Sequence, residues 1–95
     1  MTDGAAAPSV LVVLPAALLA LFPGATAEVT LCAASVDAAL AVLNLRWPGM
    51  RARLCDSRPA IRRHINVFVN GERATLATPL PPGAELVVTT AISGG

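Results

Sequence analysis

The chain ends on two glycines, Gly94 and Gly95, which follow the stretch Ala91-Ile92-Ser93. A terminal glycine places no side chain beside its carboxylate, and glycine adopts backbone conformations that are closed to other residues. The five residues 91–95, if extended, reach about 16 Å. We therefore expect a thin tail that can carry the Gly95 carboxylate from the folded body into another protein's active site. The alternative is a frayed terminus without function, because chain ends are commonly poorly ordered.

Few other residues offer chemistry. The chain has one histidine, His64, and no Cys-x-x-Cys pair, so we expect no metal site. Its two cysteines, Cys32 and Cys55, are not typical of a disulfide scaffold in so aliphatic a chain, and we expect reduced thiols and a cytoplasmic protein. No Ser/His/Asp or Cys/His set is apparent.

All seven basic residues are arginine, and the chain has no lysine. Residues 46–63 contain Arg46, Arg51, Arg53, Arg58, Arg62 and Arg63. This Arg-rich segment could bind phosphate or an acidic partner, which makes Arg62 and Arg63 candidate partner-binding residues. The alternative, which we favour, is that residues 50–64 form a solvated connection. Arginines without interleaved aromatic side chains offer no platform for single-stranded nucleic acid, so we expect no nucleic-acid partner.

Length and composition indicate one domain with an aliphatic core. The 95 residues are 55% hydrophobic and 14% charged, with a net charge of +1, which is typical of a globular chain and not of a disordered one. The aromatic residues are Phe22, Trp47 and Phe68. We divide the chain into a loose lead-in over residues 1–8, a folded domain over 9–90 and the tail over 91–95.

The first half of the domain predicts a β-hairpin. Val10–Leu14 is a β-branched run that ends at Pro15, and Ala27–Cys32 alternates apolar and polar residues, so both are expected to be strands. A short helical turn over Ala16–Phe22 and a turn at Pro23-Gly24 would connect them.

The same region has some features of a secretory signal. No charge lies between Asp3 and Glu28, and Ala25-Thr26-Ala27 has the small residues of a cleavage site. However, a signal begins with basic residues, and this chain has only Asp3 there. Pro15 also divides the apolar run, which is too short to span a bilayer. We expect a retained strand and no membrane partner.

A helix and a second group of strands follow. Ser35 is a helix N-cap residue, and the helix it begins is expected to end at Trp47-Pro48-Gly49. Its apolar face is formed by Val36, Leu40, Leu43 and Trp47. Further along, Ile65–Val69 alternates strictly and runs into Asn70-Gly71, a strong hairpin-turn signal.

Phe68 occupies the outward position of that strand, because Ile65, Val67 and Val69 share the opposite face. An outward phenylalanine is either covered by a neighbouring segment or part of a docking surface. After an irregular return over Arg73–Leu80, which could hold a minor strand, Pro81-Pro82-Gly83 leads to a last strand at Glu85–Thr90. The order predicts an α+β fold, the β-grasp or ubiquitin-like roll. It would have a mixed sheet of four to five strands, one main helix on one face, and the last strand parallel to the first.

The chain resembles the MoaD/ThiS family of sulfur carriers, and within it the MoaD-like and CysO-like members. The matching segments are Ser35–Leu40, Trp47–Met50, Arg53-Leu54, Ile65–Glu72, Thr78–Leu80, Pro82–Leu86 and the terminal Gly94-Gly95, and the resemblance covers about residues 9–95. Two features depart from the family pattern. The return after Glu72 is short and lacks an acidic residue before Thr78, and Ala91-Ile92-Ser93 precedes the glycines where the family often has Val-Ala.

The resemblance implies that this protein is a carrier and not an enzyme, with no stably bound cofactor of its own. An E1-like adenylyltransferase of the MoeB/ThiF type would use ATP to activate the Gly95 carboxylate, which then becomes a thiocarboxylate and donates its sulfur through a sulfur-accepting synthase. Ile92, Ser93 and Gly94 would form the tail, and Phe68, Arg62 and Arg63 are the candidate partner-binding residues. Two alternatives stay open. One is a ubiquitin-like modifier conjugated through Gly95, and the other is a non-transferring binding module that uses the Arg-rich segment 46–63.

Overall fold

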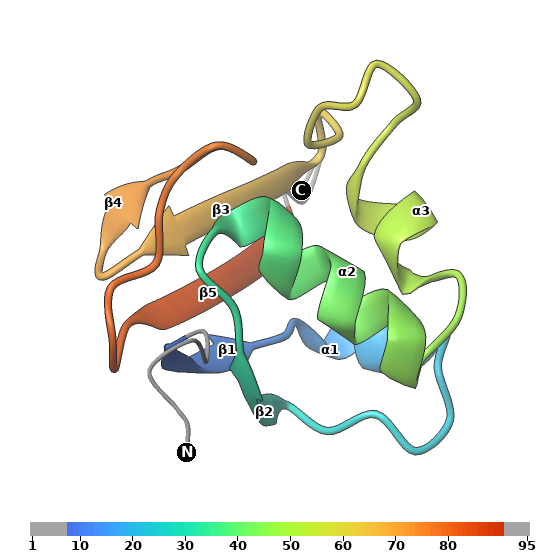
Figure 1. Ribbon diagram of the computed structural model, residues 1–95. Helices are drawn as coiled ribbons and strands as arrows, with labels where there is room; N and C mark the ends of the chain where they lie inside the picture. Colours follow the sequence, from blue (N-terminus) through green and yellow to red (C-terminus); the bar gives the residue numbers. More distant parts are fainter. Residues whose placement is uncertain (1–7, 91–95) are drawn as a thin grey trace.

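A computed structural model of the chain describes residues 8–90 (Figure 1). The elements in chain order are β1 (Ser9–Val13), α1 (Ala16–Leu19), β2 (Glu28–Cys32), α2 (Val36–Arg46), α3 (Met50–Leu54), β3 (Ile65–Val69), β4 (Glu72–Arg73) and β5 (Glu85–Thr90). The predicted lead-in, apart from its last residue, and the predicted tail with Ile92, Ser93, Gly94 and Gly95 lie outside the described residues.

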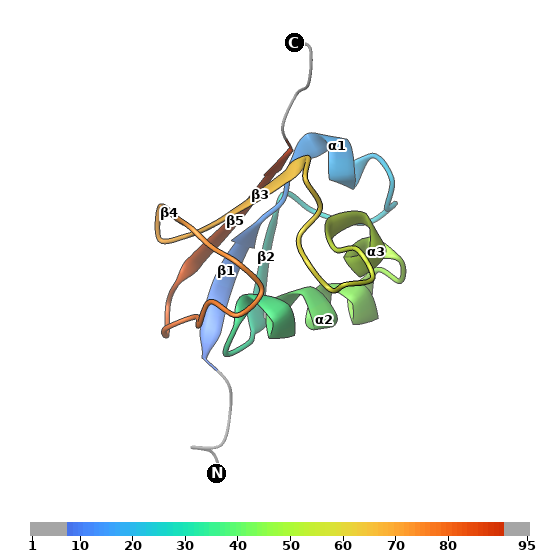
Figure 2. The same cartoon turned by 90° about the horizontal axis from the view of Figure 1, so that it is seen from above.

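The strands form one mixed sheet in the order β2-β1-β5-β3-β4. β1 and β5 pair in parallel, with Val12 opposite Leu86, and the other neighbours are antiparallel. Figure 2 shows α2 and α3 on the same side of this sheet. Because the last strand lies between the first strand and the third, the β-grasp fold predicted from the sequence is confirmed.

The predicted N-terminal hairpin is present. β1 and β2 pair in register from Ser9 opposite Cys32 to Val13 opposite Glu28. The connection passes through Gly24, whose φ of 90° is open to glycine and costly for other residues. Val10 and Val12 are buried in the core, as an internal strand requires. Within residues 8–90, no helix is long and apolar enough to cross a membrane.

The main helix, α2, begins where the sequence predicts. The Ser35 hydroxyl oxygen accepts a hydrogen bond from the Ala38 N–H at 3.1 Å, which satisfies one of the free donors at the helix start. Val36, Leu40 and Leu43 are fully buried against the sheet. The helix ends at Arg46, and Trp47 is its C-cap residue, in agreement with the predicted end.

Residues 50–64 differ from the solvated connection that the sequence predicts. They begin with a short helix, α3, whose Met50 and Leu54 are both fully buried. These two residues are four positions apart and therefore lie on one helical face. Of the two arginines between them, Arg53 is exposed and Arg51 is half-buried. The Asn44 side-chain oxygen accepts from the backbone N–H groups of Gly49 and Arg51, at 3.0 and 3.2 Å, and so holds the start of α3 against α2.

The second half of the sheet follows the predicted strands closely. β3 matches its predicted range, and the turn after it has positive φ at Asn70 (50°) and Gly71 (87°), as the hairpin signal requires. The minor strand β4 begins at Glu72, one residue before the predicted return segment.

Candidate functional site

The predicted reacting group lies beyond the end of β5. Thr90, the last residue of that strand, lies opposite Ile65, the first residue of β3. Gly95, Gly94, Ser93 and Ile92 are outside the described residues, so the structure places only their point of attachment. That point is the end of the central strand, which pairs with β1 as far as Val87 and with β3 as far as Thr90.

The face of the sheet turned away from α2 and α3 carries a continuous cross-strand row. The strand pairings align Glu28 with Val13, Val13 with Val87, Val87 with Phe68, and Phe68 with Arg73. We call this set of five residues the outer row. Each of the five strands contributes one residue to it.

The centre of the outer row is apolar and its ends are charged. Val13, Val87 and Phe68 are half-buried, whereas Glu28 and Arg73 are exposed. Among residues 8–90, Figure 2 shows no helix over this side of the sheet. An apolar strip with a polar rim is the usual composition of a protein-binding surface.

Phe68 faces outward, as its strand alternation predicts. The Arg73 guanidinium carbon lies 5.8 Å from the centre of the Phe68 ring, within the range of a cation–π contact. The ring is thus partly covered, by one exposed arginine side chain and not by a packed segment. Sequence reasoning missed Val13, Val87 and Arg73, although the same alternation places each of them on the face opposite the core.

Arg62 and Arg63 lie at a different place from Phe68. Both precede β3, near the sheet end where Thr90 lies, whereas Phe68 is on the outer face. The Arg62 Nε–H donates to the Ala52 carbonyl at 2.8 Å and its backbone N–H donates to the Leu54 carbonyl at 2.9 Å, so Arg62 joins the end of α3 to the start of β3. Arg63 is exposed.

Most arginines of the segment 46–63 bind groups of the chain itself. Arg46 donates to the Thr30 carbonyl at 3.2 Å, Arg51 pairs with Asp37, and Arg58 donates from Nε to Asp56 at 2.9 Å. The hydrogen bonds from Arg58 hold the pKa of Asp56 at about 2, below the ordinary aspartate value. These contacts explain why the arginines cluster without requiring an acidic partner for the whole segment.

The cysteines are both free, and they differ in environment. Cys32 is exposed on the edge strand β2, whereas Cys55 is buried at the end of α3. Burial raises the pKa of the Cys55 thiol, which disfavours the nucleophilic thiolate. Within residues 8–90, no group of three His, Cys, Asp or Glu side chains is placed to hold a metal ion.

Comparison with known proteins identifies the family and supports the fold. Residues 12–95 match the ThiS family. A comparison with curated proteins gave no match. Among solved structures, SAMP1 from Haloferax volcanii has 30% identity and a TM-score of 0.77, and the match covers 92% of this chain and 99% of that one.

Two further structures concern CysO. A chain of the BexX/CysO complex of Amycolatopsis orientalis has 29% identity and a TM-score of 0.81, with 90% of this chain and 99% of that one covered. CysO of Mycobacterium tuberculosis, described as an antigen, has 25% identity and a TM-score of 0.77, with 87% and 99% covered. These similarities support a sulfur carrier or ubiquitin-like modifier, and small carrier proteins of this kind are generally not enzymes themselves.

Proposed function

Because the chain belongs to the ThiS family, we propose that it is a sulfur carrier whose Gly95 carboxylate is adenylated and then converted to a thiocarboxylate. The observation that carries the proposal is the family match through Gly95, together with a tail attachment point on the central strand. The activating partner is an E1-like adenylyltransferase of the MoeB/ThiF type, and a synthase accepts the sulfur.

The chemistry needs nothing from the carrier except its carboxylate. A Gly95 carboxylate oxygen attacks the α-phosphorus of ATP and pyrophosphate leaves, which yields an acyl-adenylate. Sulfide then attacks the acyl carbon, the carbon–oxygen bond to the phosphate breaks, and AMP departs. ATP is bound by the partner, so the carrier holds no cofactor, and the reaction is proposed to take place in the cytoplasm.

The outer row supplies the surface that the activating partner recognises. Its apolar centre lies at Val87 on β5, the strand that leads to the tail, and at Val13 and Phe68 on the two strands beside it, and Glu28 and Arg73 flank it with opposite charges. The relative CysO is itself found in a complex, with BexX. This supports a carrier whose sheet is bound by the partner while its tail enters the partner's active site.

A second function, protein modification through Gly95, is favoured by one observation. The chain is 30% identical to SAMP1 of Haloferax volcanii, and SAMP1 stands for small archaeal modifier protein 1. Both functions share adenylation and differ in the acceptor of the acyl group, which is sulfide for the carrier and a lysine amine for the modifier.

The experiment that tests the proposal is intact-mass spectrometry after incubation with ATP, sulfide and the E1-like partner from the same source. The expected product has one Gly95 carboxylate oxygen replaced by sulfur. An unmodified mass, obtained with a partner that is active on another carrier, would reject the sulfur-carrier function. Lysine-linked conjugates without thiocarboxylate would instead support the modifier.

A further inference from the structure

The connection between β1 and β2 has a composition that differs from the polar one typical of surface turns. Residues 15–27 contain no charged side chain. Their one hydroxyl side chain, Thr26, donates to the Glu28 carbonyl at 2.8 Å, so it is used within the chain. The surface that this connection presents to solvent is therefore almost entirely apolar.

Four apolar residues in the first half of this connection are exposed. We call them the α1 patch, and they are Ala16, Ala17, Ala20 and Leu21. Leu21 is 50% exposed, which is high for a large hydrophobic side chain in a folded domain. A group of exposed apolar side chains on a small domain indicates a surface that binds another molecule.

The α1 patch is held in place by the core beneath it. Leu18, which lies between its members in the sequence, is buried. The Leu18 N–H donates to the Pro15 carbonyl and the Leu21 N–H to the Leu18 carbonyl, each at 3.0 Å. The Phe22 ring lies at the junction of α2 and α3, where a Cβ atom added to Gly49 would be 3.7 Å from it. A surface fixed in this way loses little conformational entropy when a partner binds.

The start of α1 is level with the base of the tail. β1 and β5 are adjacent parallel strands, with Val13 opposite Val87. α1 begins at Ala16, three residues after Val13, and β5 ends at Thr90, three residues after Val87. Pro15 is extended (φ −76°, ψ 151°), so the direction of β1 continues to Ala16. Since adjacent strands are about 4.8 Å apart, α1 starts beside the point from which the tail leaves, and Figure 2 shows α1 at this end of the sheet.

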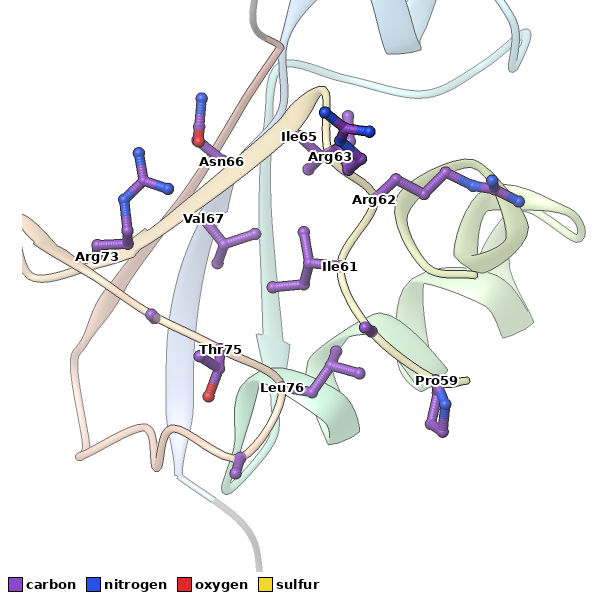
Figure 3. Close-up of a pocket in the computed structure, with 13 residues that line it drawn as sticks. Pro59, Ile61, Arg62, Arg63, Ile65, Asn66, Val67, Arg73, Thr75 and Leu76 are labelled. Atoms are coloured by element: carbon purple, nitrogen blue, oxygen red, sulfur yellow. The ribbon is translucent and has the colours of Figure 1, made fainter. Parts of the chain in front are cut away.

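The other flank of the tail base is charged. Ile65, on β3, lies opposite Thr90. Figure 3 shows Arg62 and Arg63 near Ile65, where they help to line an open pocket of about 550 Å³. Arg63 and the following His64 are exposed. A protein that covers the base of the tail therefore meets an apolar flank at α1 and a basic flank at the start of β3.

We propose that the α1 patch docks the E1-like adenylyltransferase that activates Gly95, through an apolar, uncharged surface of that enzyme. The inference rests on the proposed function and names a second contact for it, separate from the outer row. The tail determines the occupant. Its five residues reach about 16 Å, so an active site that receives the Gly95 carboxylate brings the enzyme surface to the end of the sheet at which α1 lies. The centre of a protein interface is depleted in charged residues, as the α1 patch is.

The test compares the original chain with Leu21→Asp in pyrophosphate release by the E1-like enzyme, at a series of carrier concentrations. The KM for the carrier should rise about tenfold or more, because a carboxylate covered by an apolar surface has no partner. The kcat should change little, because a change that removes only binding raises KM alone. Leu21→Met, which keeps an apolar side chain of similar volume, should behave like the original chain.

A matched pair of alanine variants separates the α1 patch from charge in general. Ala20→Asp places a carboxylate in the patch. Ala34→Asp makes the same change at an exposed position just after β2. Because Cys32 at the end of β2 lies opposite Ser9 at the start of β1, Ala34 is at the opposite end of the sheet from the tail. Only Ala20→Asp should raise KM, and the amide NMR dispersion shows whether each variant is folded.

Three results would overturn the inference. One is a KM for Leu21→Asp equal to that of the original chain. Another is an equal rise in KM for Ala20→Asp and Ala34→Asp, which would reflect the net charge and not the patch. The third is a fall in kcat at unchanged KM, which would place the effect on the chemical step and not on docking.

Failure of the proposed function gives a different result. The original chain would then release no pyrophosphate with an enzyme that is active on another carrier, and the inference would fail with it. If the original chain reacts and Leu21→Asp reacts with the same KM, only the docking assignment fails. Slower sulfur transfer from that variant would then assign the patch to the accepting synthase, and loss of a dimer in sedimentation would assign it to a second copy of the chain.

Discussion

Phe68 on β3 lies directly opposite Val87 on β5, and Val87 is three residues before the end of its strand at Thr90. At the usual rise of about 3.3 Å per residue, the apolar centre of the outer row is about 10 Å from the base of the tail. A single partner surface can therefore contact Phe68 and receive the residues after Thr90. Phe68 lies near the base of the tail because the antiparallel register of β3 and β5 places it opposite Val87.

Phe68→Ala should weaken binding to the activating enzyme by about 1–3 kcal/mol, the range of an interface hot spot. The ring is half-buried and outside the core, so the melting temperature should change little. Binding is measured by calorimetry and stability by thermal unfolding. Leu45→Ala is the matched control, because Leu45 is 81% exposed on α2, away from the outer row. A large loss of stability with normal binding would place Phe68 among the core residues instead.

Deleting Gly95 should abolish adenylation and leave the fold unchanged. The shortened tail no longer brings a carboxylate to the nucleotide, and correct placement of reacting groups carries much of the rate of such a reaction. Gly94→Val should act similarly, through bulk and through restriction of the backbone. Pyrophosphate release with the E1-like partner measures the first step, and the amide NMR spectrum reports the fold. Thiocarboxylation of the Gly95-deleted chain would show that the site is assigned to the wrong residue.

Ser35→Ala should lower the free energy of unfolding by about 0.5–2 kcal/mol, because the Ala38 N–H loses its acceptor at the start of α2. Urea unfolding measures the change. Ser57→Ala is the control, since Ser57 is exposed in the loop after α3 and should be close to neutral. Equal effects of the two substitutions would mean that the cap contributes nothing to stability.

The Asp56 carboxylate should make stability depend on pH in the acid range. Its pKa is lowered to about 2 by the Arg58 hydrogen bonds, below the ordinary value of 3.8 expected in the unfolded chain. A depressed folded-state pKa contributes stability that is fully present above about pH 4 and is lost as pH falls toward 2. The contribution is small, because the pair is exposed to solvent.

Asp56→Asn tests this dependence by removing the charge while keeping an acceptor of similar shape. The difference in urea midpoint between the original chain and the variant should be largest at neutral pH and should shrink between pH 4 and pH 2. Glu72→Gln, a change at an exposed strand position, serves as the comparison for general charge effects. A difference that stays constant across this range would mean that the pair with Arg58 does not couple to folding.

Several elements could be predicted because their signals are local. Asn70-Gly71 requires only two adjacent residues that tolerate positive φ, and Ser35 requires only a side-chain oxygen three residues before the N–H that it accepts. The alternation of Ile65–Val69 was sufficient to place Phe68 on the outer face. The order of such elements, together with the resemblance to the MoaD/ThiS family, was sufficient for the β-grasp fold and the family.

Other features depend on contacts between distant parts of the chain. The short helix α3 was missed because its buried residues, Met50 and Leu54, are only two and stand among arginines, and because the Asn44 side chain that holds its start comes from α2. The contacts of the arginines could not be predicted either. Arg62, for example, donates to the Ala52 carbonyl, a backbone group that sequence patterns do not identify.

The sequence by itself determined the strands, the main helix, the turns and the glycine end, because each is encoded by neighbouring residue types and their periodicity. Only the tertiary structure decided that Glu28, Val13, Val87, Phe68 and Arg73 form one row. The physical reason is register. A shift of one residue in any strand pairing would turn a side chain to the opposite face, and that register is set by the packing of the whole core.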